Sequence, residues 1–267
     1  MRAERTLAIV LRHFYLVRGS PARALPLFVW VAVDMVLWGF ITRYLNSVAS
    51  PGFNFVPVLL GAVLFWDFFT RVMQGVTTAF FEDVWSRNFL NLFATPISIP
   101  EYLGGLVLSS IATSSIGLGV MLALSGAIFG LNFLSYGLMI VPFVAVLFLF
   151  GIALGVFASA LVLRLGPASE WLVWPIPALL SPLAGVFYPL ATLPRPMQVL
   201  ARLLPPSYVF EGLRRVVRGG ATSGASLAWG FGLAVLYLLL ACAFFVHVQR
   251  GAVRTGLIAR YSAESVN

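Results

Sequence analysis

The stretch at residues 138–163, LMIVPFVAVLFLFGIALGVFASALVL, contains no charged residue. An α-helix needs about 20 apolar residues to cross the roughly 30 Å hydrocarbon core of a bilayer, because it rises about 1.5 Å per residue. A surface helix of a soluble protein has one apolar and one polar face, whereas this stretch is apolar all round. It therefore predicts a transmembrane helix.

Five more apolar runs flank this stretch and set the fold class. The chain has 267 residues, of which 60% are hydrophobic and 10% are charged. Soluble domains contain about 25% charged residues. We expect an all-α integral membrane protein with six transmembrane helices in a single transmembrane domain, residues 1–267. The predicted spans are residues 24–45, 56–81, 102–130, 138–163, 171–190 and 227–248, and the fifth contains four prolines.

The N-terminal segment, residues 3–18, is amphipathic. It places apolar side chains at helical spacing between arginines. This pattern predicts a helix lying in the lipid headgroup region. A simple N-terminal extension of the first span is the alternative.

Residues 191–226 contain two short amphipathic pieces, 197–204 and 207–217, separated by Pro205 and Pro206. Neither piece is long enough to cross the bilayer, and lipid tolerates such backbone only where protein or water satisfies it. We expect a re-entrant or surface-lying helical pair, with an ordinary external loop as the alternative. The residues singled out in this region are Pro205, Pro206, Tyr208, Glu211 and Arg214.

The net charge is +8, and the positions of the basic residues predict the topology. All basic residues are arginine, and they lie between apolar runs and at the termini, which is typical of membrane topology rather than of nucleic-acid binding. Six spans put both termini on one side, and their arginines place that side in the cytoplasm. Residues 191–226 disagree, because they carry five arginines on the predicted outer side. The chain thus divides into an interfacial helix (1–23), spans one to five (24–190), an external re-entrant region (191–226), span six (227–248) and a cytoplasmic tail (249–267).

Residues suited to catalysis or metal binding are scarce. His13 and His247 are near opposite ends of the chain, and Cys242 is the one cysteine. A Walker A loop needs a lysine to reach the β- and γ-phosphates of a nucleotide, and the sequence has none. We therefore expect no enzyme activity, cofactor or metal in this chain, and expect any ATP hydrolysis to occur in a partner.

Three ionisable residues lie well inside predicted spans, away from the span ends, where charges are costly and mark functional sites. Asp67 and Arg71 are four residues apart and share one face of the second span. Asp34 lies at a similar depth in the first span. If these spans are neighbours, the three residues form a cluster. We interpret it as a structural ion network joining the two spans; a path for a solute or for protons is the alternative.

Small and hydroxyl residues in the third and fourth spans suggest helix contacts. Gly126 and Gly130, and likewise Gly151 and Gly155, have the spacing that lets membrane helices approach closely. The third span also has five hydroxyl side chains, which either line a path or bond back to their own helix. They are Ser109, Ser110, Thr113, Ser114 and Ser115.

The segment after the second span, residues 82–93, predicts a short amphipathic helix that is charged at its start and stopped by Pro96. A rigid helix projecting from the second span can transmit force from a docked partner into the membrane. The composition also allows a mere connecting helix. The residues expected to contact the partner are Glu82, Asp83, Trp85, Arg87, Phe89, Leu90 and Phe93.

These features together resemble the permease subunit of type-2 ABC exporters. The resemblance rests on the arginine-rich N-terminal helix, on DMVLWGF at residues 34–40 and on LFATPIS at residues 92–98. It also rests on the region before the last span, with LP at residues 193–194, LPPSY at 204–208 and EGLR at 211–214. It covers essentially the whole chain and depends on the order and spacing of these motifs.

The resemblance implies a homodimer, or a pair of related permeases, in a bacterial cytoplasmic (inner) membrane. Two copies of a cytoplasmic ABC ATPase, which bind ATP and Mg, would dock on coupling helices at residues 82–93. The export path would lie between the permeases, lined by spans one, two and five. The implied substrate is a drug, a polysaccharide or an amphipathic or lipid-linked solute. An ATP-independent secondary transporter or channel is the alternative function.

Overall fold

The computed structural model of the chain describes residues 3–48, 56–86, 92, 95–131 and 133–255, and every element within these ranges is helical. The all-α prediction is confirmed. The long helices are α3 (Pro26–Val48), α4 (Gly61–Trp85), α6 (Ile99–Phe129), α7 (Ile140–Leu165) and α11 (Gly224–Arg254). The shorter α-helices are α1 (Ala3–Arg18), α2 (Pro21–Ala24), α8 (Ile176–Ala184), α9 (Arg195–Ala201) and α10 (Pro205–Val217). Short 3-10 helices cover Phe133–Met139, Pro167–Leu172 and Leu190–Thr192, and a π-helical turn covers Val56–Leu60.

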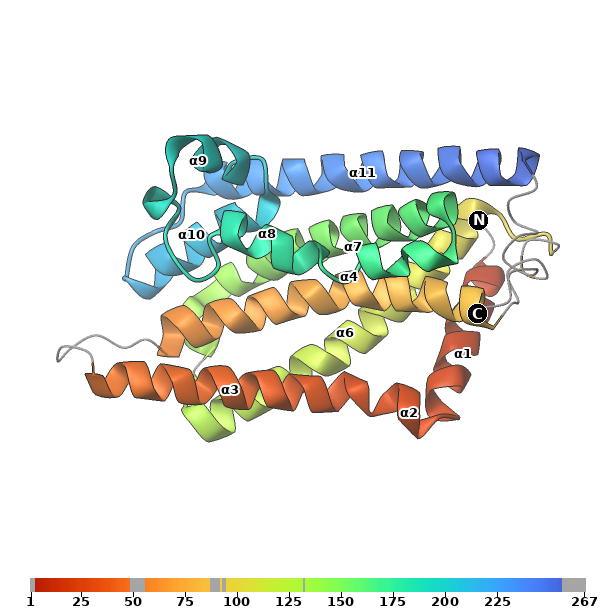
Figure 1. Cartoon of the computed structure of the whole chain (residues 1–267). Helices are drawn as coiled ribbons and strands as arrows, with labels where there is room; N and C mark the ends of the chain where they lie inside the picture. Colours follow the sequence, from red (N-terminus) through yellow and green to blue (C-terminus); the bar gives the residue numbers. More distant parts are fainter. Residues whose placement is uncertain (1–2, 49–55, 87–91, 93–94, 132, 256–267) are drawn as a thin grey trace.

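The long helices lie side by side as a bundle (Figure 1). α1 and the last turns of α4 and α11 lie at one end, which we call the α1 end, and α9 and α10 lie at the other. Among the residues that the structure describes, four helical segments are long and apolar enough to cross a membrane. They are Val56–Trp85, Ile99–Phe129, Tyr136–Leu165 and Gly224–Arg254. These four correspond to the second, third, fourth and sixth predicted spans.

The fifth predicted span, residues 171–190, is not one long helix. It is divided between the end of a 3-10 helix, a turn, the nine residues of α8 and a bent link. Pro175 precedes α8, and Gly185, with φ of 67°, ends it. Nine residues rise about 14 Å, less than half of the hydrocarbon thickness, so α8 alone does not span a bilayer.

The long helices α4 and α7 approach each other closely in the core. Gly151 and Gly155 of α7 face α4, where added Cβ atoms would lie 2.9 Å from Val72 Cβ and 2.8 Å from the Met73 backbone oxygen. Next to the glycines, the Phe69 ring of α4 stacks on the Phe150 ring of α7, with centroids 5.6 Å apart. The small-residue prediction is therefore correct for this pair.

The other glycine pair has a different role. Within the described part of the chain, no atom lies within 4 Å of a Cβ added to Gly130, and Gly126 has only one backbone oxygen at 3.7 Å. Gly130 adopts φ of 68° and ends α6, a backbone conformation that favours glycine. This pair therefore forms a helix terminus and not a packing surface.

We expect Gly155→Ala to lower the free energy of unfolding by about 1–3 kcal/mol, because the new methyl group would press on the backbone of α4, which cannot move aside as a side chain can. The measurement is the thermal midpoint of the purified protein in detergent. Gly119→Ala on α6 is the control, since nothing lies within 4 Å of its added Cβ. Equal shifts for the two variants would contradict this account of the α4–α7 contact.

Candidate functional site

One face of α4 is polar along most of the helix. Asp67, Arg71, Gln74, Thr78 and Glu82 follow one another at intervals of three or four residues, which places them on one side. The opposite side is apolar and packs against α7. A polar face on a membrane helix has to be turned toward protein or water. It therefore marks where a polar site can form.

A cavity of about 640 Å³ lies along this polar face. It exists because α3 packs along α6 and contacts α4 only slightly. Gly39 of α3 permits that packing, since a Cβ there would collide with the Phe129 ring. The cavity reaches from Asp67, near the start of α4, to Trp85 at its end. Its other walls come from α1, α2, α3, α6 and Trp174.

The three ionisable residues predicted to cluster all line this cavity. Asp34 comes from α3, and Asp67 and Arg71 come from α4. They are close enough to interact electrostatically with one another. The Arg71 side chain crosses to α6, where its Cδ lies 3.1 Å from the position of a Cβ on Gly117. The cluster therefore contacts α3, α4 and α6, whereas the sequence predicted contacts between the first two spans only.

The hydroxyl side chains of α6 divide into three groups. Ser110 donates a hydrogen bond of 2.8 Å to the Val72 backbone oxygen and so joins α6 to α4. Thr113 bonds back to its own helix. The buried hydroxyls of Ser109 and Ser114 line the cavity and have no hydrogen-bond partner in the part of the chain that the structure describes.

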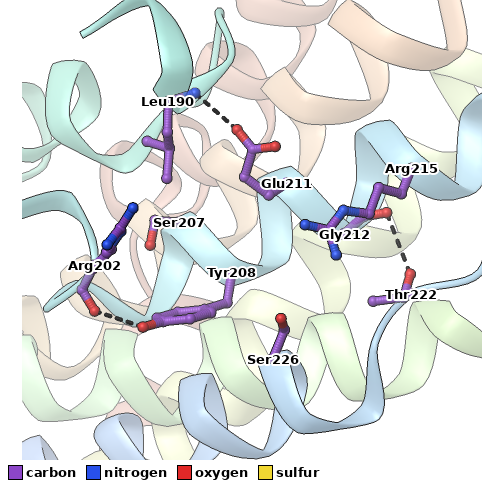
Figure 2. A pocket seen from close by; sticks show the side chains of 9 residues that line it. All are labelled: Leu190, Arg202, Ser207, Tyr208, Glu211, Gly212, Arg215, Thr222 and Ser226. Carbon is purple, nitrogen blue, oxygen red and sulfur yellow. Dashed lines mark hydrogen bonds between the residues drawn. The ribbon is translucent and has the colours of Figure 1, made fainter. Parts of the chain in front are cut away.

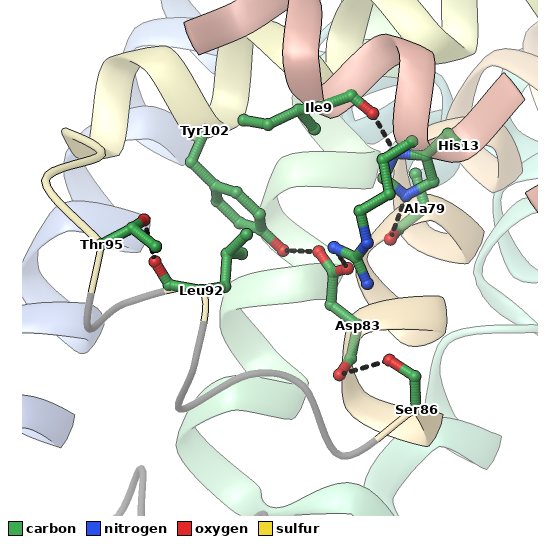
Figure 3. A network of polar contacts seen from close by, with 9 residues as sticks. Ile9, His13, Ala79, Asp83, Ser86, Leu92, Thr95 and Tyr102 are labelled. Carbon is green, nitrogen blue, oxygen red and sulfur yellow. Dashed lines mark hydrogen bonds and ion pairs between the residues drawn. The ribbon is translucent and has the colours of Figure 1, made fainter. Parts of the chain in front are cut away.

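At the α1 end, ion pairs fasten α1 and α2 to α4 and α6; we call this set of contacts the α1 clasp. The Asp83 carboxylate has no exposed surface, pairs with Arg12 and accepts a 2.8 Å hydrogen bond from the Tyr102 hydroxyl (Figure 3). Removing one partner of a buried ion pair costs about 3–5 kcal/mol, because a buried charge is left uncompensated. Asp83 therefore depends on α1 for its charge partner.

Three further contacts complete the α1 clasp. Arg23 of α2 donates to Glu82 at 2.8 Å. Arg5 lies 3.6 Å from Glu101 and donates to a backbone oxygen. The ring nitrogens of His13 contact the backbone oxygens of Ile9 at 3.0 Å and Ala79 at 2.8 Å (Figure 3). Carbonyl oxygens only accept, so both contacts are hydrogen bonds when both nitrogens carry protons.

The structure places only part of the segment predicted to contact a partner. Glu82 and Asp83 are the buried last turn of α4 and bind α1 and α2. Trp85 is half-exposed, and its indole nitrogen donates to Glu170 at 2.9 Å. The rest of the predicted contact lies outside the described residues: Arg87, Phe89, Leu90 and Phe93.

At the opposite end, α10 holds the link after α8. Arg214 donates a 2.7 Å hydrogen bond to the Gly185 backbone oxygen and a 3.0 Å bond to Glu211. Glu211 also accepts from the Leu190 backbone at 2.8 Å (Figure 2). Burial lowers the pKa of the Arg214 guanidinium from its ordinary value, and the Glu211 carboxylate counteracts this.

Two short helices, α9 and α10, form in this region as predicted, but the boundary differs. Pro205 and Pro206 begin α10 instead of separating the helices, because proline fits the first turn, where its missing N–H is not needed. The Tyr208 hydroxyl donates to the Arg202 backbone oxygen at 2.8 Å, which ties α10 to the link before it (Figure 2). A small cavity of about 190 Å³ lies beside these residues.

Long apolar helices with charged side chains along a polar cavity are typical of an integral membrane protein. Within the described residues, no group of three His, Cys, Asp or Glu side chains is arranged to hold a metal ion. The model of the ABC-2 family transporter protein family matches residues 39–243, well over half of the chain. The chain belongs to this family and is the permease subunit of an ABC-2 type transporter. No curated protein matches it.

Sequence reasoning found Asp34, Asp67 and Arg71 of the cavity, and it missed Arg23 and the uncharged residues of α4. Thr70, Gln74 and Thr78 carry no charge, so they do not stand out in an apolar run. Their spacing from Asp67 was the available signal, since together they extend one polar face over most of α4.

We expect Arg12→Met to destabilise the protein by about 3–5 kcal/mol, because it leaves a buried carboxylate without its cation. The double variant with Asp83→Asn should recover part of this loss, since the unpaired charge is then gone. Thermal midpoints in detergent measure both, and Arg18→Met, exposed on the same helix, is the control. A double variant as unstable as the sum of its single variants would contradict this role for the pair.

The cavity should admit water-soluble reagents. In a Cys242→Ala background, Thr78→Cys should react several times faster with a charged methanethiosulfonate than Val76→Cys, which has no exposed surface on the same helix. The rates are measured by mass spectrometry on protein in lipid nanodiscs. Equal rates would show that the cavity is closed to water.

Proposed function

We propose that this chain forms the membrane path of an ATP-driven exporter, as one of two permease copies coupled to separate cytoplasmic ATPase subunits. The observation that carries the proposal is the α1 clasp in a chain of the ABC-2 family. Ion pairs hold the last turn of α4 to α1 and α2, and a hydrogen bond holds it to α6, immediately before the segment expected to contact the ATPase. Force applied there would move the end of α4, which lines the cavity.

The proposed membrane arrangement has six crossings, with both termini in the cytoplasm. α3 has 23 residues, which rise about 35 Å and are enough for a further crossing. The remaining crossing, which is the fifth in chain order, would be formed by α8 together with the links on either side of it. The arginines at residues 2–23 and 250–260 support a cytoplasmic location for the α1 end. In a bacterium this would be the inner membrane.

α1 is proposed to lie in the headgroup region. Its polar side, with Arg12 and His13, faces the protein, whereas Leu7, Leu11 and Phe14 are exposed on the other side. An exposed apolar stripe beside a bundle of membrane helices is suited to contact with lipid. α1 would then hold the α1 end of the bundle at the membrane surface.

A second copy of the chain is the proposed partner within the membrane. The outward face of α3 is apolar and exposed at Val33, Leu37, Phe40 and Tyr44. This face is long enough to form part of the interface along which a substrate would pass. ATP and Mg would be bound by the two ATPase subunits. The substrate would be a drug, a polysaccharide or an amphipathic or lipid-linked solute.

An ATP-independent secondary transporter or channel is the second candidate function. The observation that favours it is the intramembrane charge cluster of Asp34, Asp67 and Arg71, which is typical of ion-coupled sites. The two candidates differ in their energy source. Purified chain, alone in vesicles and moving its cargo uphill, would establish the second candidate and exclude the first.

The tagged chain should copurify with an ATPase that contains a Walker A loop. Replacing Phe89 and Leu90 by Ala should reduce the recovered ATPase several-fold, because apolar anchor residues dominate the energy of protein interfaces. Leu138→Ala, exposed at the opposite end of the bundle, is the control and should leave recovery unchanged. Undiminished recovery with the double variant would contradict the proposed docking segment.

A further inference from the structure

We propose that the cavity along α4 binds an amphipathic organic cation. Its positive group would lie between Asp34 and Asp67, and its apolar part would lie toward Trp30, Trp85 and Trp174. This inference rests on the proposed function and deepens it by naming the class of substrate. It concerns a site within one chain, beside the path expected between two permeases.

In its deeper part, the cavity has more acidic than basic side chains. Six acidic or basic side chains line the cavity: His13, Arg23, Asp34, Asp67, Arg71 and Glu82. Glu82 is paired with Arg23 at 2.8 Å, so these two cancel. The deeper part keeps two carboxylates for the single guanidinium of Arg71. One positive charge from a ligand would balance this part of the site.

Polar atoms in the same wall lack partners, which is independent evidence for a ligand. Ser114 is 2% exposed and Ser109 is 7% exposed, and neither hydroxyl oxygen has a hydrogen-bond partner among the residues described. The same holds for the Thr70 hydroxyl and for Oδ2 of Asp67. A buried polar atom without a hydrogen bond costs about 1–3 kcal/mol. A ligand that donates hydrogen bonds would remove that cost.

The size and aromatic lining of the cavity also suit this class of ligand. A volume of about 640 Å³ is within the range of sites for small molecules. Three tryptophans line the cavity and are partly exposed: Trp30, Trp85 and Trp174. Indole rings attract organic cations through their faces and also contact apolar groups. The excess carboxylate disfavours anionic substrates, such as phosphate-linked glycans.

The test measures binding of tetraphenylphosphonium to the purified chain in nanodiscs, with binding to empty nanodiscs subtracted. This lipophilic monocation has no hydrogen-bond donor, so it tests the charge and the aromatic lining of the site. We expect saturable binding. Asp34→Asn and Asp67→Asn should each weaken it at least about tenfold, because each removes a nearby charge from a partly buried site. Trp30→Ala should weaken it a few-fold. The matched control is Glu4→Gln, which removes the same charge from an exposed position on α1.

Binding that is not saturable, or that is equal in Asp34→Asn, Asp67→Asn and Glu4→Gln, would overturn the proposal. So would equal saturable binding of tetraphenylborate, an anion of the same shape. If Asp67→Asn does not fold, Asp34→Asn on the half-exposed face of α3 decides the question. The assay contains neither nucleotide nor ATPase. A cation site can therefore be confirmed even if no ATPase partner is found, and can fail while ATP-driven transport is established.

Discussion

The buried carboxylate of Asp83 determines how the helices pack at the α1 end of the bundle. Asp83 has no contact with solvent, and a charge in such a place is tolerated only beside an opposite charge with good hydrogen bonding. Both come from outside its own helix, as the Arg12 guanidinium and the Tyr102 hydroxyl. α4 therefore reaches its final position only with α1 docked on it. The cavity, which α1 and α2 help to line, depends on the same interaction.

The clasp and the cavity are parts of one arrangement. Glu82 lines the cavity while it pairs with Arg23, so a group of the clasp is also a group of the site. A shift of the α4 terminus would change the shape of the cavity without any separate device to carry the signal. This continuity is a physical basis for the coupling that we propose between a cytoplasmic partner and the membrane path.

Much of this fold could be predicted from the sequence, since long apolar runs have few alternatives to membrane helices. The fifth run could not be assigned correctly by length, because Pro175 and Gly185 limit α8 to nine residues. The amphipathic pattern of α1 was visible. However, the burial of its polar side against the bundle depends on partners distant in sequence, such as Asp83 on α4 and Tyr102 on α6.

The candidate site was predictable in a similar, partial way. Charges inside apolar runs identified Asp34, Asp67 and Arg71, and proximity of the first two spans was a reasonable assumption. The cavity itself was not predictable, because it results from the position of α3, which the Gly39–Phe129 contact fixes against α6. Only tertiary structure reveals that α3 and α4 are kept apart.

The glycine contact between α4 and α7 has a consequence for motion. With the Met73 backbone oxygen and the Val76 side chain fitted against Gly155, sliding α4 along α7 would drive side chains into helix backbone. These two helices should therefore move as one rigid body. In the described ranges α3 contacts α4 only slightly, so a change in the volume between them is achieved most easily by tilting α3. The protein would then change shape on the side of α4 that faces α3, and it would stay rigid on the side of α4 that packs against α7.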